Sequence, residues 1–236
     1  MKKNLKYLVD INDLILFDSD GSIIDTGKIE NYNKNHDGSG RFSSGPGDSG
    51  SKVVDLSTMS DDKRIDYLMN SMSANYTEDE IYACNKYTSM TWAESINKYY
   101  RTDNADNLNN ELHGITVDDI KEHANLINSA AKKSPLKESM YLYRVTDHMP
   151  ANLKLGDIYT DKGFGSTSAV DGLFKYDYMV HRVKIKAKKG TPIVNMSAVT
   201  KSLYGTVDNQ AEIVMALNTS YRVTSIDGKN IELEVI

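Results

Sequence analysis

Two stretches of the chain carry polar side chains of the kinds that bind anions. Asn97 and Arg101 are four residues apart, so on a helix their amide and guanidinium lie on one face and can reach one ligand, although a solvated helix face has the same pattern. Arg144 lies in the apolar run 141–145, where an unpaired arginine is costly. It therefore indicates a buried ion pair, a bound anion such as a diphosphate, or a solvated edge strand.

Two further stretches can position a carboxylate. Residues 163–168 read Gly-Phe-Gly-Ser-Thr-Ser, and hydroxyls on such a strand can orient a neighbouring carboxylate or a ligand amide, although an ordinary edge strand is also rich in Ser and Thr. Gln210 and Glu212 are two residues apart, so on a strand they point to the same face. An amide there can read a substrate group beside a carboxylate.

Other familiar chemistries find no support in the sequence. The single cysteine, Cys84, excludes an intramolecular disulfide and a zinc site built from several cysteines, and the five histidines lack ligand spacing, so we predict no metal. Residues 45–50 spell Gly-x-Gly-x-x-Gly but lie in a linker composition with no strand before them. With Gly21 at the sixth position of a calcium loop, Leu16 and Gly27 would be its first and twelfth residues, which excludes that motif.

The elements that must position these residues change character along the chain. Apolar residues recur at helical spacing from residue 60, a capping box of Thr77 and Glu80 begins a second helix, and Thr116 caps a fourth that ends before Pro135. The helices are expected near 60–72, 78–87, 90–101 and 116–132. The period then becomes two, and the strands are expected at 140–145, 163–168, 179–187, 192–195, 211–217, 221–226 and 230–236. Helices followed by many short strands indicate an α+β fold.

Composition divides the chain of 236 residues, which is long enough for one large domain or a medium domain with an appendage. Residues 27–52 are rich in Gly and Ser and have three large apolar residues, too few to offset the entropy of ordering. We predict a short N-terminal segment (1–26), a flexible linker (27–56) and a catalytic domain (57–236). The net charge of −5 disfavours a protein that binds phosphate backbones over a wide surface, while a local basic groove stays compatible.

The order of these motifs resembles that of the Arg-Ser-Glu class of ADP-ribosyltransferase exoenzymes. The resemblance covers roughly residues 60–236 and rests on an acid-rich helix start at 77–80, Tyr-Thr at 87–88, Asn97 with Arg101, Tyr-Arg at 143–144, Ser-Thr-Ser at 166–168, and Gln-x-Glu at 210–212. It implies N-terminal helices packed on a mixed or antiparallel two-sheet β core with an NAD cleft. NAD+ would be consumed as a co-substrate, without a metal.

The resemblance also implies roles for individual residues. Glu212 would hold a hydroxyl of the nicotinamide ribose and stabilise the oxocarbenium-like centre as nicotinamide leaves, which agrees with the value of a pre-oriented carboxylate beside developing positive charge. Ser166 would orient Glu212, and Gln210 would complete the catalytic set. The residues implied in NAD binding are Arg144, Asn97, Arg101, Phe164, Ser166, Thr167 and Ser168. Two departures from the family are Val145, where glycine is usual, and residues 174–176, which offer no arginine for a second phosphate contact.

The acceptor is indicated by Gln210 and Tyr204, which resemble the family's target-recognition residues, although Tyr204 lies further upstream than is usual. Glutamine at this position goes with asparagine acceptors or, in some members, with guanine bases, since an amide can donate and accept hydrogen bonds. A protein acceptor is the leading prediction. The alternatives are transfer to a nucleic-acid base and a catalytically inactive phage-particle binding module.

A second resemblance concerns residues 35–45, which are similar to linkers of tailed-phage head-associated proteins, some of them joined to transferase domains. It implies a phage or prophage setting, delivery by a particle or by secretion, and action in the cytoplasm of a target cell. Residues 1–3 begin like an export signal, but Asp10 and Asp13 interrupt the apolar stretch that follows. We therefore predict a soluble protein without a recognisable signal peptide, and no contact with a membrane.

Overall fold

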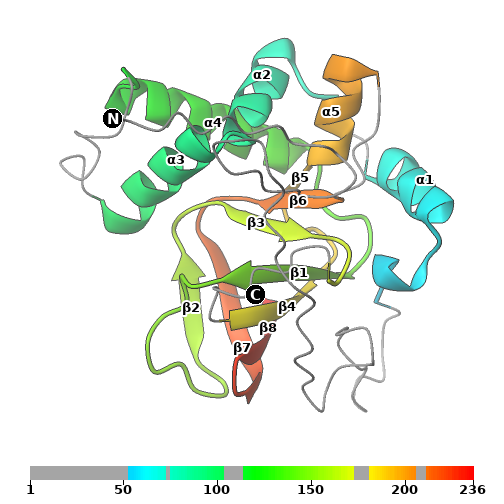
Figure 1. Cartoon of the computed structure of the whole chain (residues 1–236), viewed down its shortest axis with the longest axis vertical. Coiled ribbons are helices and arrows are strands. Elements are labelled where there is room, and N and C mark those ends of the chain that lie inside the picture. Colours follow the sequence, from blue (N-terminus) through cyan, green and yellow to red (C-terminus); the bar gives the residue numbers. More distant parts are fainter. Residues whose placement is uncertain (1–52, 73–74, 104–113, 173–180, 206–210) are drawn as a thin grey trace, which may run out of the picture. The chain divides into compact units, whose positions relative to one another are not determined.

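The computed structural model describes residues 53–72, 75–103, 114–172, 181–205 and 211–236, so the predicted N-terminal segment and the linker up to residue 52 lie outside it. Five α-helices, one short 3-10 helix and eight strands make up this part (Figure 1). The helices are η1 (Leu56–Thr58), α1 (Asp61–Ser71), α2 (Glu78–Tyr87), α3 (Met90–Thr102), α4 (Val117–Lys133) and α5 (Met196–Tyr204). The strands are β1 (Met140–Thr146), β2 (Ile158–Asp161), β3 (Gly165–Ser168), β4 (His181–Ala187), β5 (Ile193–Asn195), β6 (Glu212–Met215), β7 (Thr219–Asp227) and β8 (Asn230–Val235).

Side-chain caps begin α2 and α4 at the predicted residues. The Thr77 hydroxyl accepts from the Glu80 backbone N–H at 3.2 Å, and the Glu80 carboxylate accepts from the Thr77 N–H at 2.8 Å. Thr116 and Asp119 form the same reciprocal pair at the start of α4. Such caps satisfy backbone donors that have no partner within the helix, which fixes where each helix begins.

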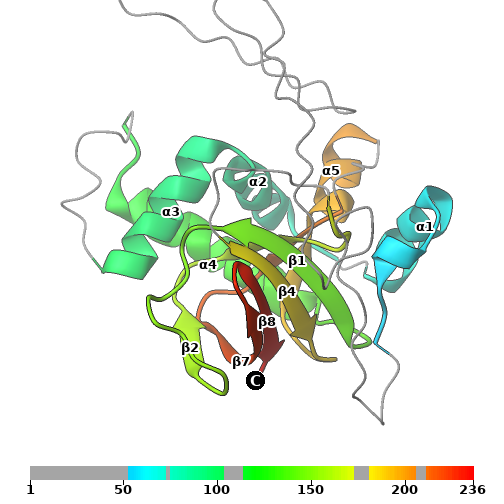
Figure 2. The same ribbon diagram turned by 60° about the horizontal axis from the view of Figure 1, so that its bottom comes forward.

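The eight strands form one mixed sheet in the order β2-β7-β8-β4-β1-β3-β6-β5. The β4–β8 pair is parallel and the other neighbours are antiparallel. β1 and β3 are in register at a single pair, Tyr143 with Ser168, so the sheet has two halves that meet at a narrow seam. Figure 2 shows β1, β4 and β8 side by side in the larger half.

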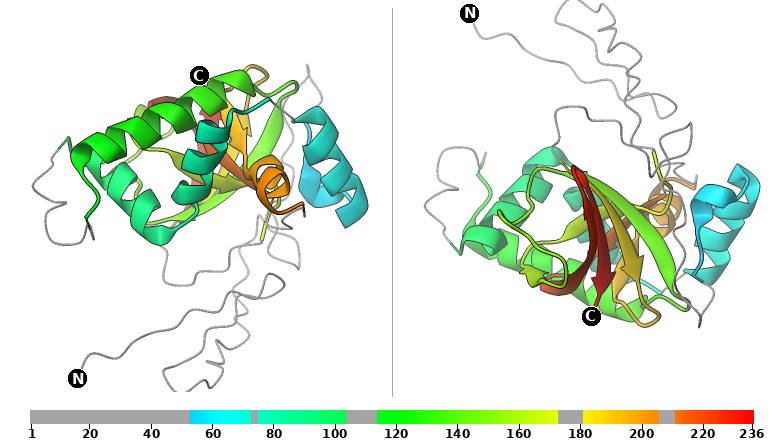
Figure 3. Two further views of the ribbon diagram at one scale, coloured as in Figure 1. Left: turned by 90° about the horizontal axis from the view of Figure 1, so that it is seen from above. Right: turned by 90° about the horizontal axis from the view of Figure 1, so that it is seen from below.

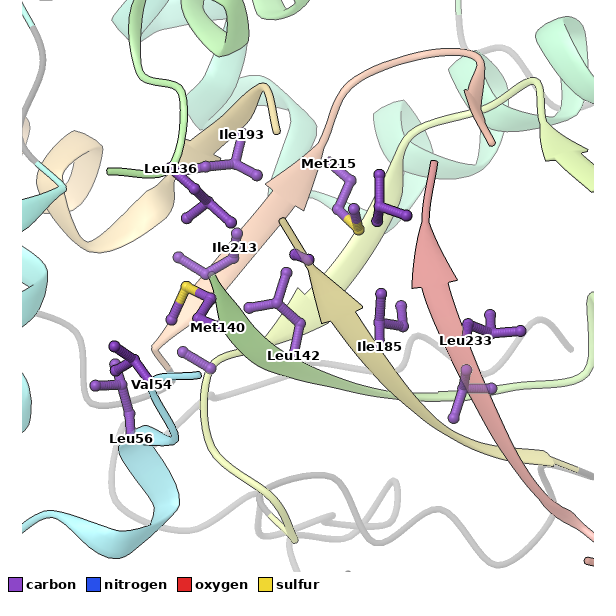
Figure 4. Close-up of a cluster of buried hydrophobic side chains, with 14 of the residues drawn as sticks. Val54, Leu56, Leu136, Met140, Leu142, Ile185, Ile193, Ile213, Met215 and Leu233 are labelled. Atoms are coloured by element: carbon purple, nitrogen blue, oxygen red, sulfur yellow. The ribbon is translucent and has the colours of Figure 1, made fainter. Parts of the chain in front are cut away.

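Two apolar cores lie on the two faces of the smaller half, β3-β6-β5. Ile213 and Met215 of β6 pack with Leu142, Ile185 and other residues of the larger half, so one core fills the space between the halves (Figure 4). Val214, which lies between these two residues on β6, points to the other face and packs against the helices. It forms the second core with residues that include Ile96, Ile120 and Ile127. Alternation along a strand sends neighbouring side chains to opposite faces, and α2 to α5 cover the second face (Figures 1 and 3).

The four predicted helices and the predicted α+β fold are confirmed, and three elements, the short η1, β2 and α5, were not predicted. β2 is a four-residue edge strand whose inner face is only partly buried, and α5 is short and follows β5 directly with Asn195 as its N-cap, so neither has a clear period in the sequence. The domain also starts earlier than residue 57. Val54 bridges to Met140 and Leu56 is fully buried in the first core.

Candidate active site

Asn97 and Arg101, one turn apart on α3, both bind the backbone that leads into β3. The Asn97 Oδ1 accepts from the Phe164 N–H at 2.7 Å, and Arg101 Nη2 donates to the Phe164 carbonyl at 3.2 Å. An added Cβ on Gly163 would lie 2.7 Å from Asn97 Oδ1 and 2.9 Å from Arg101 Nε, so this close approach requires a glycine. The pair is therefore not a solvated helix face, because it holds β3 against α3.

Arg144 takes part in a buried cluster of two guanidinium groups and one carboxylate. Asp161 accepts from Arg101 Nε and Nη2 at 2.8 and 2.9 Å and from Arg144 Nη1 at 3.3 Å, and the Gly163 N–H also donates to it at 3.0 Å. Burial alone would raise the pKa of the Asp161 carboxyl, but the hydrogen bonds from Arg101 and the charge of Arg144 outweigh it and hold that pKa below its usual value. With both arginines charged, the three side chains carry one unbalanced positive charge.

Two neutral phenols and a glycine lie next to Arg144. The rings of Tyr159 and Tyr221 stack with centroids 5.2 Å apart, and burial raises the pKa of both hydroxyls, so they stay protonated at neutral pH. An added Cβ on Gly165 would lie 3.4 Å from the Tyr221 hydroxyl and 3.6 Å from Arg144 Nη1. The guanidinium of Arg144 is thus packed directly under the first residue of β3.

The carboxylate of Glu212 shares one strand face with two serines. Glu212 is in register with Ser168, and Val214 is in register with Ser166. Paired residues on antiparallel strands point to the same side, so Ser166, Ser168 and Glu212 lie on the helix-facing side of the sheet, with Ser168 directly opposite Glu212 and Ser166 diagonal to it. Thr167 points to the other side, where its hydroxyl donates to the Ile213 carbonyl at 2.7 Å.

Tyr87, the last residue of α2, links this face to α3. Its hydroxyl lies 2.9 Å from Asn97 Nδ2 and 3.3 Å from Ser166 Oγ, and its ring meets Phe164 edge-on at 5.4 Å. Burial raises the pKa of the Tyr87 hydroxyl; the charge of Glu212 raises it further, while that of Arg144 lowers it. Both the carboxylate and the guanidinium therefore lie within electrostatic range of this hydroxyl.

The backbone enters β6 in an uncommon conformation. Ala211, immediately before Glu212, has φ of 49°, a left-handed value that alanine rarely adopts. Its carbonyl accepts from the Ala169 N–H at 2.9 Å, and its side chain is buried. Tertiary contacts thus hold the residue that precedes the carboxylate in a strained state.

The structure brings most of the predicted site residues together. Asn97, Arg101, Arg144, Ser166, Ser168 and Glu212 lie around the junction of α2, α3 and β3. The side chain of Phe164 is fully buried, and the Thr167 hydroxyl is bonded to backbone, so neither offers a free surface to a ligand. Gln210 and residues 174–176 lie outside the described residues.

Tyr204 occupies a different position, at the exposed end of α5. Its side chain is 64% exposed, and its hydroxyl donates to Asn85 Oδ1 of α2 at 3.3 Å. Asn85 and Tyr87 belong to the last turn of the same helix. Tyr204 therefore presents an aromatic surface close to the junction without taking part in it.

Sequence reasoning missed Asp161 and gave Tyr87 no role. Asp161 is the last residue of the edge strand β2, which has no clear period, and only its tertiary contacts with Arg101 and Arg144 mark it. Tyr87 lies on the apolar face of α2 and is almost fully buried, which by itself indicates a core residue. Its neighbour Thr88 and the Tyr-Thr pair in the motif order were the available signal.

Other kinds of site find no support in the part of the chain that the structure describes. No group of three metal-ligating side chains occurs there, and no helix there is long and apolar enough to cross a bilayer. Cys84 is buried, which raises the pKa of its thiol to about 12, so it is not a nucleophile at neutral pH. The chemistry that remains is recognition of an anion by the arginine cluster next to a strand that presents a carboxylate.

Solved structures with the same fold are ADP-ribosyltransferases. C3stau2 of S. aureus is 19% identical, with a TM-score of 0.58, and the match covers 80% of this chain and 99% of that one. The C3 exoenzyme of Clostridium limosum is 17% identical, with a TM-score of 0.58 and coverage of 80% and 98%. Plx2a of Paenibacillus larvae is 23% identical, with a TM-score of 0.51 and coverage of 68% and 87%.

The family follows from the sequence itself. Residues 61–234 match the model of the ADP-ribosyltransferase exoenzymes, and the chain therefore belongs to that family. A search of curated protein sequences found no match. The family and the fold that the order of the motifs predicted are both confirmed, and the family supports an NAD+-dependent transferase.

Proposed function

We propose that this protein is a mono-ADP-ribosyltransferase that transfers ADP-ribose from NAD+ to an asparagine side chain of a protein and releases nicotinamide. The observation that carries the proposal is that Glu212, Ser166 and Ser168 share one strand face, while Arg101, Asp161 and Arg144 cluster at the start of β3, the strand that carries both serines. Relatives with the same fold have been solved with NAD or NADH, which supports NAD+ as the co-substrate.

The arginine cluster fits the diphosphate of NAD+. Its one unbalanced positive charge lies in a largely buried place, where attraction for a phosphate is stronger than in water. Arg144 holds Asp161 through a single contact of 3.3 Å, whereas Arg101 holds it through two shorter ones. Arg144 can therefore turn to a ligand phosphate while Asp161 stays fixed by Arg101.

The carboxylate of Glu212 supplies stabilisation where charge develops. The bond between C1′ of the ribose and the nicotinamide nitrogen breaks, and both of its electrons leave with nicotinamide, which becomes neutral. Positive charge then spreads over C1′ and the ring oxygen of the ribose, and a fixed carboxylate is worth most at that point. The acceptor nitrogen donates its lone pair to C1′ and loses a proton, which completes the transfer.

The acceptor assignment depends on Gln210, whose amide can donate to and accept from another amide. Tyr204, exposed at the end of α5 and six residues before Gln210 in the chain, offers an aromatic surface. Transfer to a guanine base is the second candidate, because the same amide can pair with a base edge. The net charge of −5 favours the protein acceptor.

Labelled NAD+ tests this proposal directly. The protein is incubated with NAD+ labelled in the adenylate and with cell lysate, and the product is treated with protease or with nuclease. Protease-sensitive label supports a protein acceptor, and nuclease-sensitive label supports a base. Absence of label above a Glu212→Gln control overturns both and leaves a catalytically inactive binding module, such as a component of a phage particle.

Gln210→Glu separates hydrolysis from transfer. We expect this variant to hydrolyse NAD+ at the wild-type rate within about threefold, while transfer to the original acceptor is lost or redirected, because a carboxylate cannot donate to an amide oxygen. Nicotinamide release and label transfer are measured in the same reaction. Unchanged transfer would show that Gln210 does not read the acceptor.

A further inference from the structure

The direction of the hydrogen bonds around Asn97 is fixed by backbone. The Phe164 N–H can only donate, so the Asn97 atom 2.7 Å away is its carbonyl oxygen, Oδ1. The amide nitrogen, Nδ2, therefore faces the Tyr87 hydroxyl at 2.9 Å and donates to it. One lone pair of the Tyr87 oxygen is thus occupied by a donor.

The Tyr87 hydroxyl then has its own proton free for its second neighbour. That neighbour is Ser166 Oγ, at 3.3 Å. Because burial raises its pKa, the hydroxyl stays protonated at neutral pH. Either hydroxyl can donate in this contact, and with Tyr87 as the donor the hydrogen bonds run from Asn97 to Tyr87 to Ser166. A serine oxygen that accepts from Tyr87 keeps its own proton for a different acceptor.

The face of β3 on which Ser166 lies shows where that proton can go. Ser166 points to the same side of the sheet as Glu212, diagonal to it across β3 and β6. We infer that Tyr87 is a positioning residue for the transfer reaction: it keeps the Ser166 hydroxyl as a donor directed towards Glu212 or the ribose hydroxyl that Glu212 holds. This role rests on the proposed function, and the experiments below distinguish the two.

The hydroxyl of Tyr87 is separable from its ring. The ring packs edge-on against Phe164 and belongs to the helical core, where phenylalanine would serve equally well. Among the described residues, the hydroxyl connects Asn97 with Ser166. Tyr87→Phe therefore removes the donor and keeps the packing.

The first experiment measures NAD+ hydrolysis by Tyr87→Phe. We expect kcat to fall about 3- to 12-fold, the range for one neutral hydrogen bond, while KM for NAD+ stays within about twofold. Tyr76→Phe is the matched control, because the Tyr76 hydroxyl is also partly buried but bonds Ser134 Oγ, at 2.9 Å, away from β3. An equal loss in Tyr76→Phe, or an unchanged kcat in Tyr87→Phe, would overturn the inference.

The second experiment asks whether Tyr87 acts through Ser166. In a Ser166→Ala background, Tyr87→Phe should lower kcat by less than about twofold further, because the group that it orients is gone. Multiplicative effects of the two substitutions would show that Tyr87 acts by another route. Asn97→Asp reverses the direction of the hydrogen bond between residue 97 and Tyr87. The new carboxylate accepts the Tyr87 proton and draws it away from Ser166.

Asn97→Asp should therefore lower kcat at least as much as Tyr87→Phe does, and a wild-type kcat in Asn97→Asp would contradict this direction of the hydrogen bonds. The outcome for the wild type separates the two proposals. If it hydrolyses NAD+ no faster than Glu212→Gln, the proposed function fails and this role fails with it. If the wild type is active and Tyr87→Phe is equally active, only the role of Tyr87 is overturned.

Discussion

Glu80 is a buried carboxylate and Asp161 a largely buried one, yet their surroundings differ in charge. Glu80 accepts from the Thr77 N–H, the Ser129 hydroxyl and Lys133 Nζ, all at 2.8 Å, and ties α2 to α4. It meets one cation, so this cluster is neutral. Asp161 meets two guanidinium groups and a backbone N–H, so its cluster keeps a positive charge.

The difference distinguishes a structural carboxylate from the carboxylate at the proposed binding site. Burial alone would raise the pKa of the Glu80 carboxyl, but hydrogen bonds from Lys133, Thr77 and Ser129 lower it, and the same balance holds for Asp161. Both carboxylates are therefore well satisfied. What distinguishes them is the surplus cation at Asp161, which an anionic ligand can neutralise.

Arg144→Ala should have the largest effect, because it removes the surplus cation. We expect the Kd for NAD+ to rise about 10- to 100-fold, the worth of a charge-assisted hydrogen bond, while the domain stays folded because Arg101 still holds Asp161. Calorimetric titration and thermal denaturation measure the two quantities. Unfolding of the variant would mean that the arginine is a structural ion-pair partner rather than a ligand group.

Asp161→Asn should have the next largest effect and should depend on anions. Two guanidinium groups lose their shared carboxylate, so we expect the free energy of unfolding to fall by about 1–3 kcal/mol. Inorganic diphosphate or NAD+ should restore more stability to this variant than to the wild type, since it binds the folded state and neutralises the arginines. Equal shifts of the melting temperature in both proteins would contradict the view of an anion-binding cluster.

Glu80→Gln keeps the shape of the side chain and removes its charge from a neutral cluster. We expect a loss of about 1–2 kcal/mol in the free energy of unfolding, with the Kd for NAD+ unchanged within about twofold. Diphosphate should give no added stabilisation beyond the wild-type amount. A clear change in NAD+ affinity would show that the α2–α4 cluster and the site are coupled, and the comparison would fail.

Acid should produce the smallest and most gradual effect. The folded-state pKa values of Asp161 and Glu80 lie below their usual values, so each carboxylate stabilises the fold above the unfolded pKa, and that contribution is lost as the pH falls through the folded pKa. The free energy of unfolding should thus decline below about pH 4, and Asp161→Asn and Glu80→Gln should each flatten that decline. Urea unfolding at a series of pH values measures the slope.

The elements with strong local signals could be predicted from the sequence. The caps of Thr77 and Thr116 set the starts of α2 and α4, and the alternation along β4 set that strand, because these signals lie within a few residues of one another. α5 and β2 could not be found in this way. β2 pairs only with β7, some sixty residues later, and its four residues alternate between exposed and partly buried.

The sequence named several residues that the structure brings close together, but it did not indicate which residues they contact. Arg144 left three interpretations open, and its place on an inner strand in contact with Asp161 excludes the solvated edge strand. An ion pair and a bound anion both stay compatible with this contact, which no period in the sequence encodes. Asn97 and Arg101 were expected to face a ligand, whereas the structure shows them holding the backbone at Phe164. Contacts of this kind arise from tertiary packing, so sequence spacing names the candidates and leaves their partners undetermined.

The seam between β1 and β3 has a mechanical meaning. The two halves of the sheet are in register only at Tyr143 and Ser168, so few backbone contacts hold them together and this junction can bend. Arg144 belongs to β1 in the larger half and Glu212 to β6 in the smaller half, so a ligand that contacts both residues links the two halves. Binding of such a ligand would then also make the sheet more rigid. Slower hydrogen exchange of the backbone amides of β3 would be its first measurable sign.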